Sequence, residues 1–109
     1  MKLEVHERIA IIGLLPKTEN YQALRTIRRA REMLGFSPDE LVFYKMKPGE
    51  ASGTVVWDVE KAREQIKDVP IDEYTIGLIR NALAEKDKKH QLTEDLLSIY
   101  DKFVVMYKG

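Results

Sequence analysis

The sequence predicts an α+β fold that is mainly helical: an N-terminal helix–turn–helix unit, a small antiparallel β-hairpin and a C-terminal helix pair. Three observations predict it. Helix stop and start signals crowd into residues 34–41. β-favouring residues flank a Pro- and Gly-containing loop at 48–53. Apolar residues recur at helical spacing over 21–34 and again through the last third of the chain.

The first expected helix covers residues 3–15. Its apolar residues are spaced more like a helix than a strand, although several are β-branched. Pro16 ends it, and residues 17–20 form a connection.

The second expected helix covers residues 21–34 and is amphipathic. Its apolar side chains recur at steps of three and four residues: Ala23, Leu24, Ile27, Ala30 and Leu34. Arg25, Arg28 and Arg29 lie on the opposite face, and Arg28 is spaced for an i,i+4 ion pair with Glu32.

The junction at residues 34–41 joins this helix to the next. Gly35 is placed as a C′ residue, which we expect in the left-handed conformation. Ser37 is placed to cap the next helix, with Pro38 at its first position. The spacing of Ser37 and Glu40 predicts a capping box. Two helices therefore meet here.

Residues 41–47 become increasingly β-favouring, and 54–57 is the strongest strand pattern in the chain. With the loop at 48–53 between them, they predict a hairpin with a six-residue loop. After it, Asp58 is placed either to cap a short helix over 59–65 or to begin a charged surface excursion. Residues 67–71 are interpreted as a short edge strand.

The C-terminal third is predicted to hold two helices. Asp72 caps the first, which runs to about Lys88 with Ile76, Ile79 and Leu83 buried. Thr93 is expected to cap the second, whose apolar face is predicted to be Leu96, Leu97, Tyr100, Phe103 and Val104. Three helix starts share the spacing of a hydrophobic staple: Phe36 with Leu41, Ile71 with Ile76, and Leu92 with Leu97.

Composition limits the function classes. The 109 residues fit a single domain covering 1–109, and 44% of them are hydrophobic. Eighteen basic and eighteen acidic residues cancel, which argues against general affinity for nucleic acid. The absence of cysteine excludes a disulfide scaffold and thiolate chemistry. No apolar run approaches the roughly 20 residues of a membrane span, and the N-terminus does not resemble a signal peptide. We expect a cytoplasmic protein.

No pattern predicts catalysis. His6 and His90 form no recognised metal motif, and Ser37 and Ser98 lie in no nucleophile elbow. The segment from Gly49 to Gly53 lacks the lysine and hydroxyl of a phosphate loop. We therefore predict a protein that is not an enzyme and that has no metal or cofactor.

The arginine face of the second helix is one candidate surface. Arg25, Arg28 and Arg29, beside a helix–turn–helix junction and a hairpin, are arranged as in a winged-helix protein that binds nucleic acid. A solvated helix face balanced by acids is the competing interpretation and the favoured one. The segment that follows the turn contains Asp39 and Glu40, which oppose contact with phosphate.

The C-terminal end is the other candidate surface. Residues 103–107 are apolar on all sides of a helix, so part of them should be exposed in a monomer. The candidates for an interface with a partner or a second copy are Phe103, Val105, Met106 and Tyr107, with packing into the core as the alternative. The aromatic residues Phe43, Tyr44 and Trp57 are expected to pack the hairpin onto helices rather than to form a binding surface.

Several of these segments together resemble small uncharacterised proteins of tailed bacteriophages. The resemblance is carried by Leu-Leu-Pro at 14–16, Leu-Arg-x-x-Arg at 24–28, Leu-Gly-Phe-Ser-x-x-Glu at 34–40, Trp57, and Leu-Thr-Glu-x-x-Leu-x-x-Tyr-x-x-Phe at 92–103. It implies a phage or prophage origin and a host cytoplasm, and it assigns no activity to any residue. We expect a non-enzymatic module that binds and modulates a host or defence protein, with a winged-helix-like nucleic-acid binder as the alternative.

Overall fold

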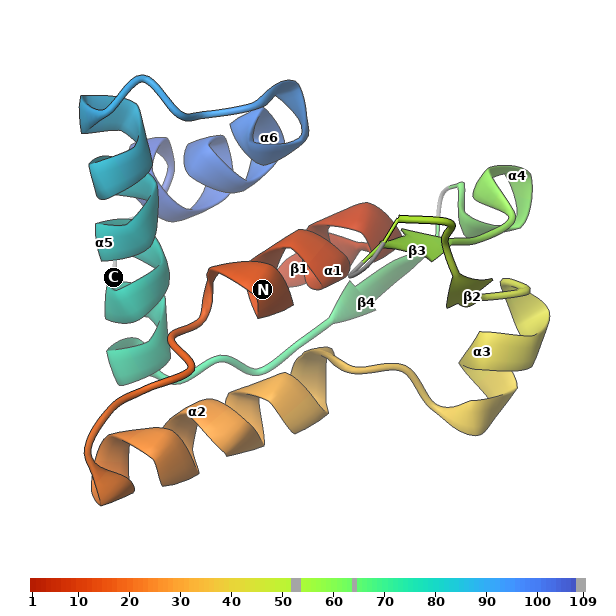
Figure 1. Ribbon diagram of the computed structural model, residues 1–109, viewed down its shortest axis with the longest axis horizontal. Coiled ribbons are helices and arrows are strands. Elements are labelled where there is room, and N and C mark those ends of the chain that lie inside the picture. The colour runs from red at the N-terminus through yellow and green to blue at the C-terminus, as the bar shows by residue number, and fades with distance from the viewer. Residues whose placement is uncertain (52–53, 64, 108–109) are drawn as a thin grey trace.

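The described residues form helices and two small antiparallel sheets of two strands each, so the fold is α+β and mainly helical, as predicted (Figure 1). The computed structural model describes residues 1–51, 54–63 and 65–107. In chain order the elements are β1 (Lys2–Glu4), α1 (Val5–Leu14), α2 (Tyr21–Leu34), α3 (Pro38–Phe43), β2 (Lys47–Pro48), β3 (Val55–Val56), α4 (Val59–Ala62), β4 (Ile66–Asp68), α5 (Glu73–Lys88), the 3₁₀ turn η1 (Glu94–Leu96), α6 (Leu97–Tyr100) and the π-helical turn η2 (Asp101–Val105).

The chain begins with a strand, and the prediction of a helix from residue 3 is wrong there. β1 pairs antiparallel with β4, and Leu3 lies opposite Lys67. The amino group of Met1 extends the contact, 2.9 Å from the Asp68 carboxylate. Pairing across more than sixty residues leaves no local spacing pattern, which is why the strand was not predicted. The edge strand is confirmed in part, since it covers Ile66–Asp68 rather than 67–71.

Helix α2 has the predicted bounds, and its predicted buried stripe is confirmed except at Leu24, which is only partly buried. Asn20 caps it by accepting a hydrogen bond of 2.9 Å from the backbone of Ala23. Ala23, Ile27, Ala30 and Leu34 are all buried. The local pattern was sufficient here because the helix buries one continuous face.

The junction before α3 contains the predicted capping box. Ser37 Oγ accepts from the backbone N–H of Glu40 at 3.1 Å, and the Glu40 carboxylate accepts from the backbone N–H of Ser37 at 3.0 Å. The predicted left-handed Gly35 is wrong: its φ of −67° and ψ of 178° are extended. Glycine fits because a Cβ here would lie only 3.2 Å from the carbonyl oxygen of Arg31.

The hairpin is confirmed, but its strands are shorter than predicted, and residues 41–43, predicted to be β-favouring, belong to α3. Lys47 pairs with Val56 and Pro48 with Val55. Gly49 donates to the carbonyl of Thr54 at 2.9 Å, while residues 52–53 of the predicted loop lie outside the described residues. The helical alternative after the hairpin is correct in kind but shorter than predicted: Asp58 caps α4 by accepting from the backbone of Lys61 at 3.2 Å, and the helix ends at Ala62 rather than at residue 65. Residue 64 of the predicted helix lies outside the described residues.

Of the two predicted C-terminal helix caps, the one at Asp72 is confirmed and the one at Thr93 is wrong. Asp72 caps α5, accepting from the Thr75 backbone at 3.2 Å and from the Thr75 hydroxyl at 2.6 Å. Thr93 makes no cap bond; its hydroxyl donates to Asp95 instead. Leu97 is 54% exposed and Ile99 is buried, so the predicted apolar face of the last helix is wrong at these positions. The change from a 3₁₀ turn to α- and π-helical turns rotates the buried face away from ideal α spacing.

Within the described part of the chain, buried apolar side chains form two clusters, one on each side of α1. The smaller cluster contains Val5, Tyr44 and Ala62, with Trp57 packed against it. In Figure 1, α3, the hairpin and α4 lie at the right, while α2, α5 and the C-terminal helices lie at the left. The main core is formed by Leu3, Ile11, Leu15, Ile27, Ala30, Leu34, Val69, Ile76, Ile79, Leu83, Leu96, Ile99 and Phe103.

Candidate functional site

An apolar groove of about 580 Å³ lies between α1, α3 and the β2–β3 hairpin. Residues from four segments form its walls. Two of these residues, Lys47 and Thr54, have polar side chains, and the others are Ile9, Ile12, Phe36, Leu41, Met46, Pro48 and Val55. Leu41 and Val55 are 44% and 42% exposed, so the walls face solvent rather than a core.

Local sequence accounts for the position of the walls formed by α1 and by the junction with α3. Ile9 and Ile12 lie three residues apart on α1, so they share one face of that helix. The capping box at Ser37 fixes the start of α3, which places Phe36 just before the cap and Leu41 one turn into the helix. The predicted staple pair thus brackets the cap, and both of its residues line the groove.

Arg8 ties α1 to the wall formed by the junction and α3. Its guanidinium donates to the carbonyl of Leu34 at 3.0 Å, to the carbonyl of Gly35, and to the Glu40 carboxylate at 2.8 Å. The guanidinium carbon also lies 3.9 Å from the centroid of the Phe36 ring. Arg8 is 1% exposed, so this charge is buried and satisfied by neighbours.

The Arg8 contact also determines the ionisation of Glu40. Hydrogen bonding from Arg8 lowers the pKa of Glu40 to about 2, outweighing the effect of partial burial, and the Ser37 backbone adds to the lowering. Glu40 is therefore ionised at every ordinary pH while the protein is folded. The same carboxylate caps α3 and neutralises Arg8, so both features depend on one residue.

The predicted arginine face is present on the surface of α2. Arg25, Arg28 and Arg29 are all exposed. The predicted pair of Arg28 with Glu32 forms at 3.6 Å, and the Arg25 guanidinium lies 5.8 Å from the Tyr21 ring centroid. The structure keeps the three arginines together on one helix face. None of them is among the described residues that line the groove.

The predicted C-terminal interface is divided by the structure. Phe103 is fully buried in the main core, so it belongs to no surface, whereas Val105 and Met106 are 65% and 59% exposed. Tyr107 is half-buried, and its hydroxyl donates to the Glu73 carboxylate at 2.7 Å. Two of the four residues therefore remain free to meet a partner.

The aromatic residues largely pack, as the favoured interpretation predicted. Tyr44 is buried and Trp57 is half-buried in the smaller cluster. Phe43 is 49% exposed, with the Lys61 ammonium 5.6 Å from its ring centroid.

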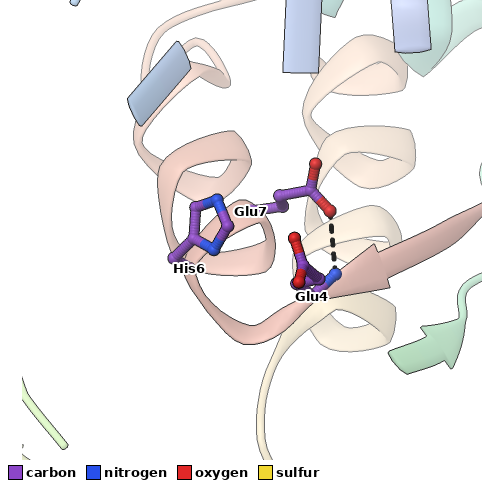
Figure 2. Close-up of side chains that lie close together, drawn as sticks. All are labelled: Glu4, His6 and Glu7. Carbon is purple, nitrogen blue, oxygen red and sulfur yellow. Dashed lines mark hydrogen bonds between the residues drawn. The ribbon is translucent and has the colours of Figure 1, made fainter. Parts of the chain in front are cut away.

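Glu4, His6 and Glu7 bring three ligand-type atoms within 4.8 Å of one another at the start of α1 (Figure 2). Sequence reasoning missed this cluster because it follows no recognised metal spacing. One Glu7 oxygen already accepts from the Glu4 backbone at 2.9 Å and from the Lys102 ammonium at 2.6 Å. Burial raises the pKa of Glu7, but these donors outweigh it and hold the pKa below its ordinary value. The adjacent ammonium would repel a cation, so we assign the cluster to the fold.

Comparisons with family models, curated proteins and solved structures find no match. The resemblance to phage proteins therefore stays a prediction. Among the described residues, every helix is too short or too polar to cross a membrane.

Proposed function

We propose that the chain is a non-enzymatic protein-binding module and that the groove is its contact surface. The groove itself carries the proposal. The apolar residues of the main core are buried, whereas Leu41 and Val55 on the groove walls are more than 40% exposed. Exposed apolar surface arranged as a hollow is typical of a site that a partner covers.

The chemistry of the walls favours a protein over a small substrate. A small-molecule or catalytic site combines an apolar pocket with several convergent polar groups. Here Lys47 and Thr54 are the polar side chains among the nine wall residues that the structure describes. Apolar side chains from a partner would fill such a groove by displacing water from both surfaces.

The resemblance to phage proteins suggests the setting. On that basis we propose that the partner is a host or defence protein in a bacterial cytoplasm and that binding modulates it. The net charge is zero, which argues against general affinity for nucleic acid and therefore supports a protein partner.

Site-specific photocrosslinking tests the proposal. A photoreactive amino acid replaces Leu41 in the groove, and a matched protein carries it at Asn81, which is exposed on α5. In bacterial extract we expect one adduct from position 41 and none from position 81. The purified partner should then bind the unmodified chain and lose binding to Leu41→Asp. Adducts that form equally at both positions, or binding that Leu41→Asp leaves unchanged, would contradict the proposal.

A nucleic-acid surface on α2 is the second candidate. Its support is that Arg25, Arg28 and Arg29 are exposed together, with Glu32 as the acid paired to one of them. If it operates, duplex binding at low salt should weaken steeply as salt rises, and Arg25→Glu with Arg28→Glu should abolish it. The absence of binding at low salt would remove this candidate.

A further inference from the structure

We propose that the occupant of the groove is an amphipathic helix of another protein, with acidic residues beside its apolar stripe. This inference rests on the proposed function, because it identifies what the groove binds. Three features of the groove and its rim carry it: a bare glycine on α1, a proline in the hairpin, and a cation among the wall residues.

Gly13 is the first feature. It lies four residues after Ile9 and directly after Ile12, so it extends the helix face that supplies one wall. The residue is exposed, its backbone is helical, and a Cβ built on it would meet nothing within 4 Å. Glycine destabilises a helix relative to alanine, and no atom of the described residues lies close enough to a Cβ at this position to require glycine. A bare backbone on the helix face of Ile9 and Ile12 would let a second helix approach α1 closely.

The hairpin argues against an added strand. Strands β2 and β3 contain two residues each, and Pro48 of β2 has no backbone N–H to donate. A peptide that extended a sheet would need main-chain partners along the edge. A helix satisfies its own backbone and needs only an apolar surface, which this groove offers through Leu41, Met46 and Val55.

Lys47 identifies the charge of the occupant. It is the charged member of the wall residues, and it forms no ion pair within 1–51, 54–63 and 65–107. An acidic side chain beside the apolar stripe of a bound helix would complete a pair with this ammonium at the edge of the contact. Such pairs mainly select the partner and its orientation.

A displayed library of random 16-residue peptides tests the inference. Selection uses the unmodified chain, with Leu41→Asp as the counter-selection, so that the retained peptides depend on the groove. We expect apolar residues at i, i+3 or i+4, and i+7, with Asp or Glu beside them, and helical circular dichroism on binding. Groove-dependent peptides with alternating apolar residues would overturn the inference that the occupant is a helix. Groove-dependent peptides with basic residues beside the apolar ones would overturn the inference that the occupant is acidic. A library that yields no groove-dependent peptide would instead overturn the proposed function.

Two glycine variants test the close approach. Gly77 on α5 also has nothing within 4 Å of a built Cβ and lies away from the groove, so Gly77→Ala is the matched control. Both alanine variants should raise the midpoint of thermal unfolding. Gly13→Ala alone should weaken the selected peptide at least tenfold. Equal affinity for Gly13→Ala and Gly77→Ala would overturn close packing against α1.

Two further measurements test charge and partner. Lys47→Glu should weaken the selected acidic peptide at least tenfold, whereas Lys88→Glu at the end of α5 should not. Equal losses would overturn the assigned role of Lys47. Sedimentation of the chain alone should show a monomer at micromolar concentration. A dimer that Leu41→Asp dissociates would show that a second copy occupies the groove and would overturn the inference of another protein.

Discussion

Apolar residues are buried to different extents on the two sides of α1. On the side of α2 and α5, residues such as Ile79, Leu83 and Phe103 have no exposed surface. On the side of α3 and the hairpin, three buried residues make a small cluster, and apolar side chains such as Leu41 and Val55 face solvent beside it. The first region contains most of the fully buried apolar side chains of the described residues, and the second leaves part of its apolar surface open to solvent.

Buried charges on α1 mark the boundary between these regions. Glu7 is fully buried and meets Lys102 of the C-terminal segment at 2.6 Å. Arg8, the next residue, points to the junction and to Glu40 at 2.8 Å. The exposed region is therefore held to the core by hydrogen-bonded charge as well as by apolar packing, and this arrangement keeps the groove walls in place without covering them.

The largest expected effect comes from truncating a buried core residue in the first region, compared with truncating a groove residue in the second. Leu83→Ala should lower the free energy of unfolding by about 2–5 kcal/mol, because it leaves a cavity among fully buried neighbours. Leu41→Ala should lower it by about 1 kcal/mol or less, because nearly half of Leu41 is already exposed. Urea unfolding measures both. Similar losses would show that the groove wall is part of a cooperative core, contrary to the comparison.

The next largest effect is expected at Arg8, whose hydrogen bonds join the two regions. Arg8→Met should cost about 3–5 kcal/mol in unfolding free energy, because it leaves Glu40 and two carbonyl groups without their buried partner. Arg28→Met is the control, since the exposed pair with Glu32 contributes only about 0.5 kcal/mol or less. If the two variants unfold at the same urea concentration, Arg8 does not hold the junction.

Acid should weaken the ion pair between Arg8 and Glu40. The pKa of Glu40 is about 2 in the folded protein against 4.5 ordinarily, so its contribution is complete above about pH 4.5 and is lost as the pH falls towards 2. The loss should be about 3 kcal/mol. Glu7, whose pKa is also lowered, acts in the same direction. Urea unfolding between pH 2 and 6 measures it, and Glu40→Gln should flatten the curve. An unchanged curve would contradict this account of Glu40.

Helix caps should give the smallest effects. Asp72→Ala and Ser37→Ala should each cost about 1 kcal/mol, because each removes an observed cap bond, one in each region. Thr93→Ala should change the unfolding free energy by less than about 0.5 kcal/mol, because Thr93 makes no cap bond. Thermal unfolding compares the three variants. A loss at Thr93 as large as that at Asp72 would contradict the observed geometry.

The sequence was a good guide where structure is local. Ser37 and Asp72 were predicted as caps, and Asp58 was predicted as a cap in one of two alternatives; each forms its bond within three residues. Local rules failed at β1, because its partner lies more than sixty residues away. They also failed at Thr93, where a 3₁₀ turn replaces the start of a regular helix.

The site was harder to predict than the fold. Arg8 and Glu7 are charged residues that a local pattern assigns to solvent, and only the long-range contacts to Glu40 and Lys102 explain their burial. The groove combines α1, the junction, α3 and the hairpin, so no single segment carries its signature. The nearest signal was the Phe36 and Leu41 staple, which predicted a local cap contact and not a surface.

Nuclear magnetic resonance of methyl groups in the folded chain tests the central claim most directly. The isoleucine, leucine and valine methyls report on both regions during titration with a peptide selected against the groove. We predict that signals of Ile9, Ile12, Leu41 and Val55 shift together, while those of Ile79 and Leu83 stay in place. Shifts centred instead on Val105, or spread equally over the main core, would contradict the claim that this groove is the binding surface.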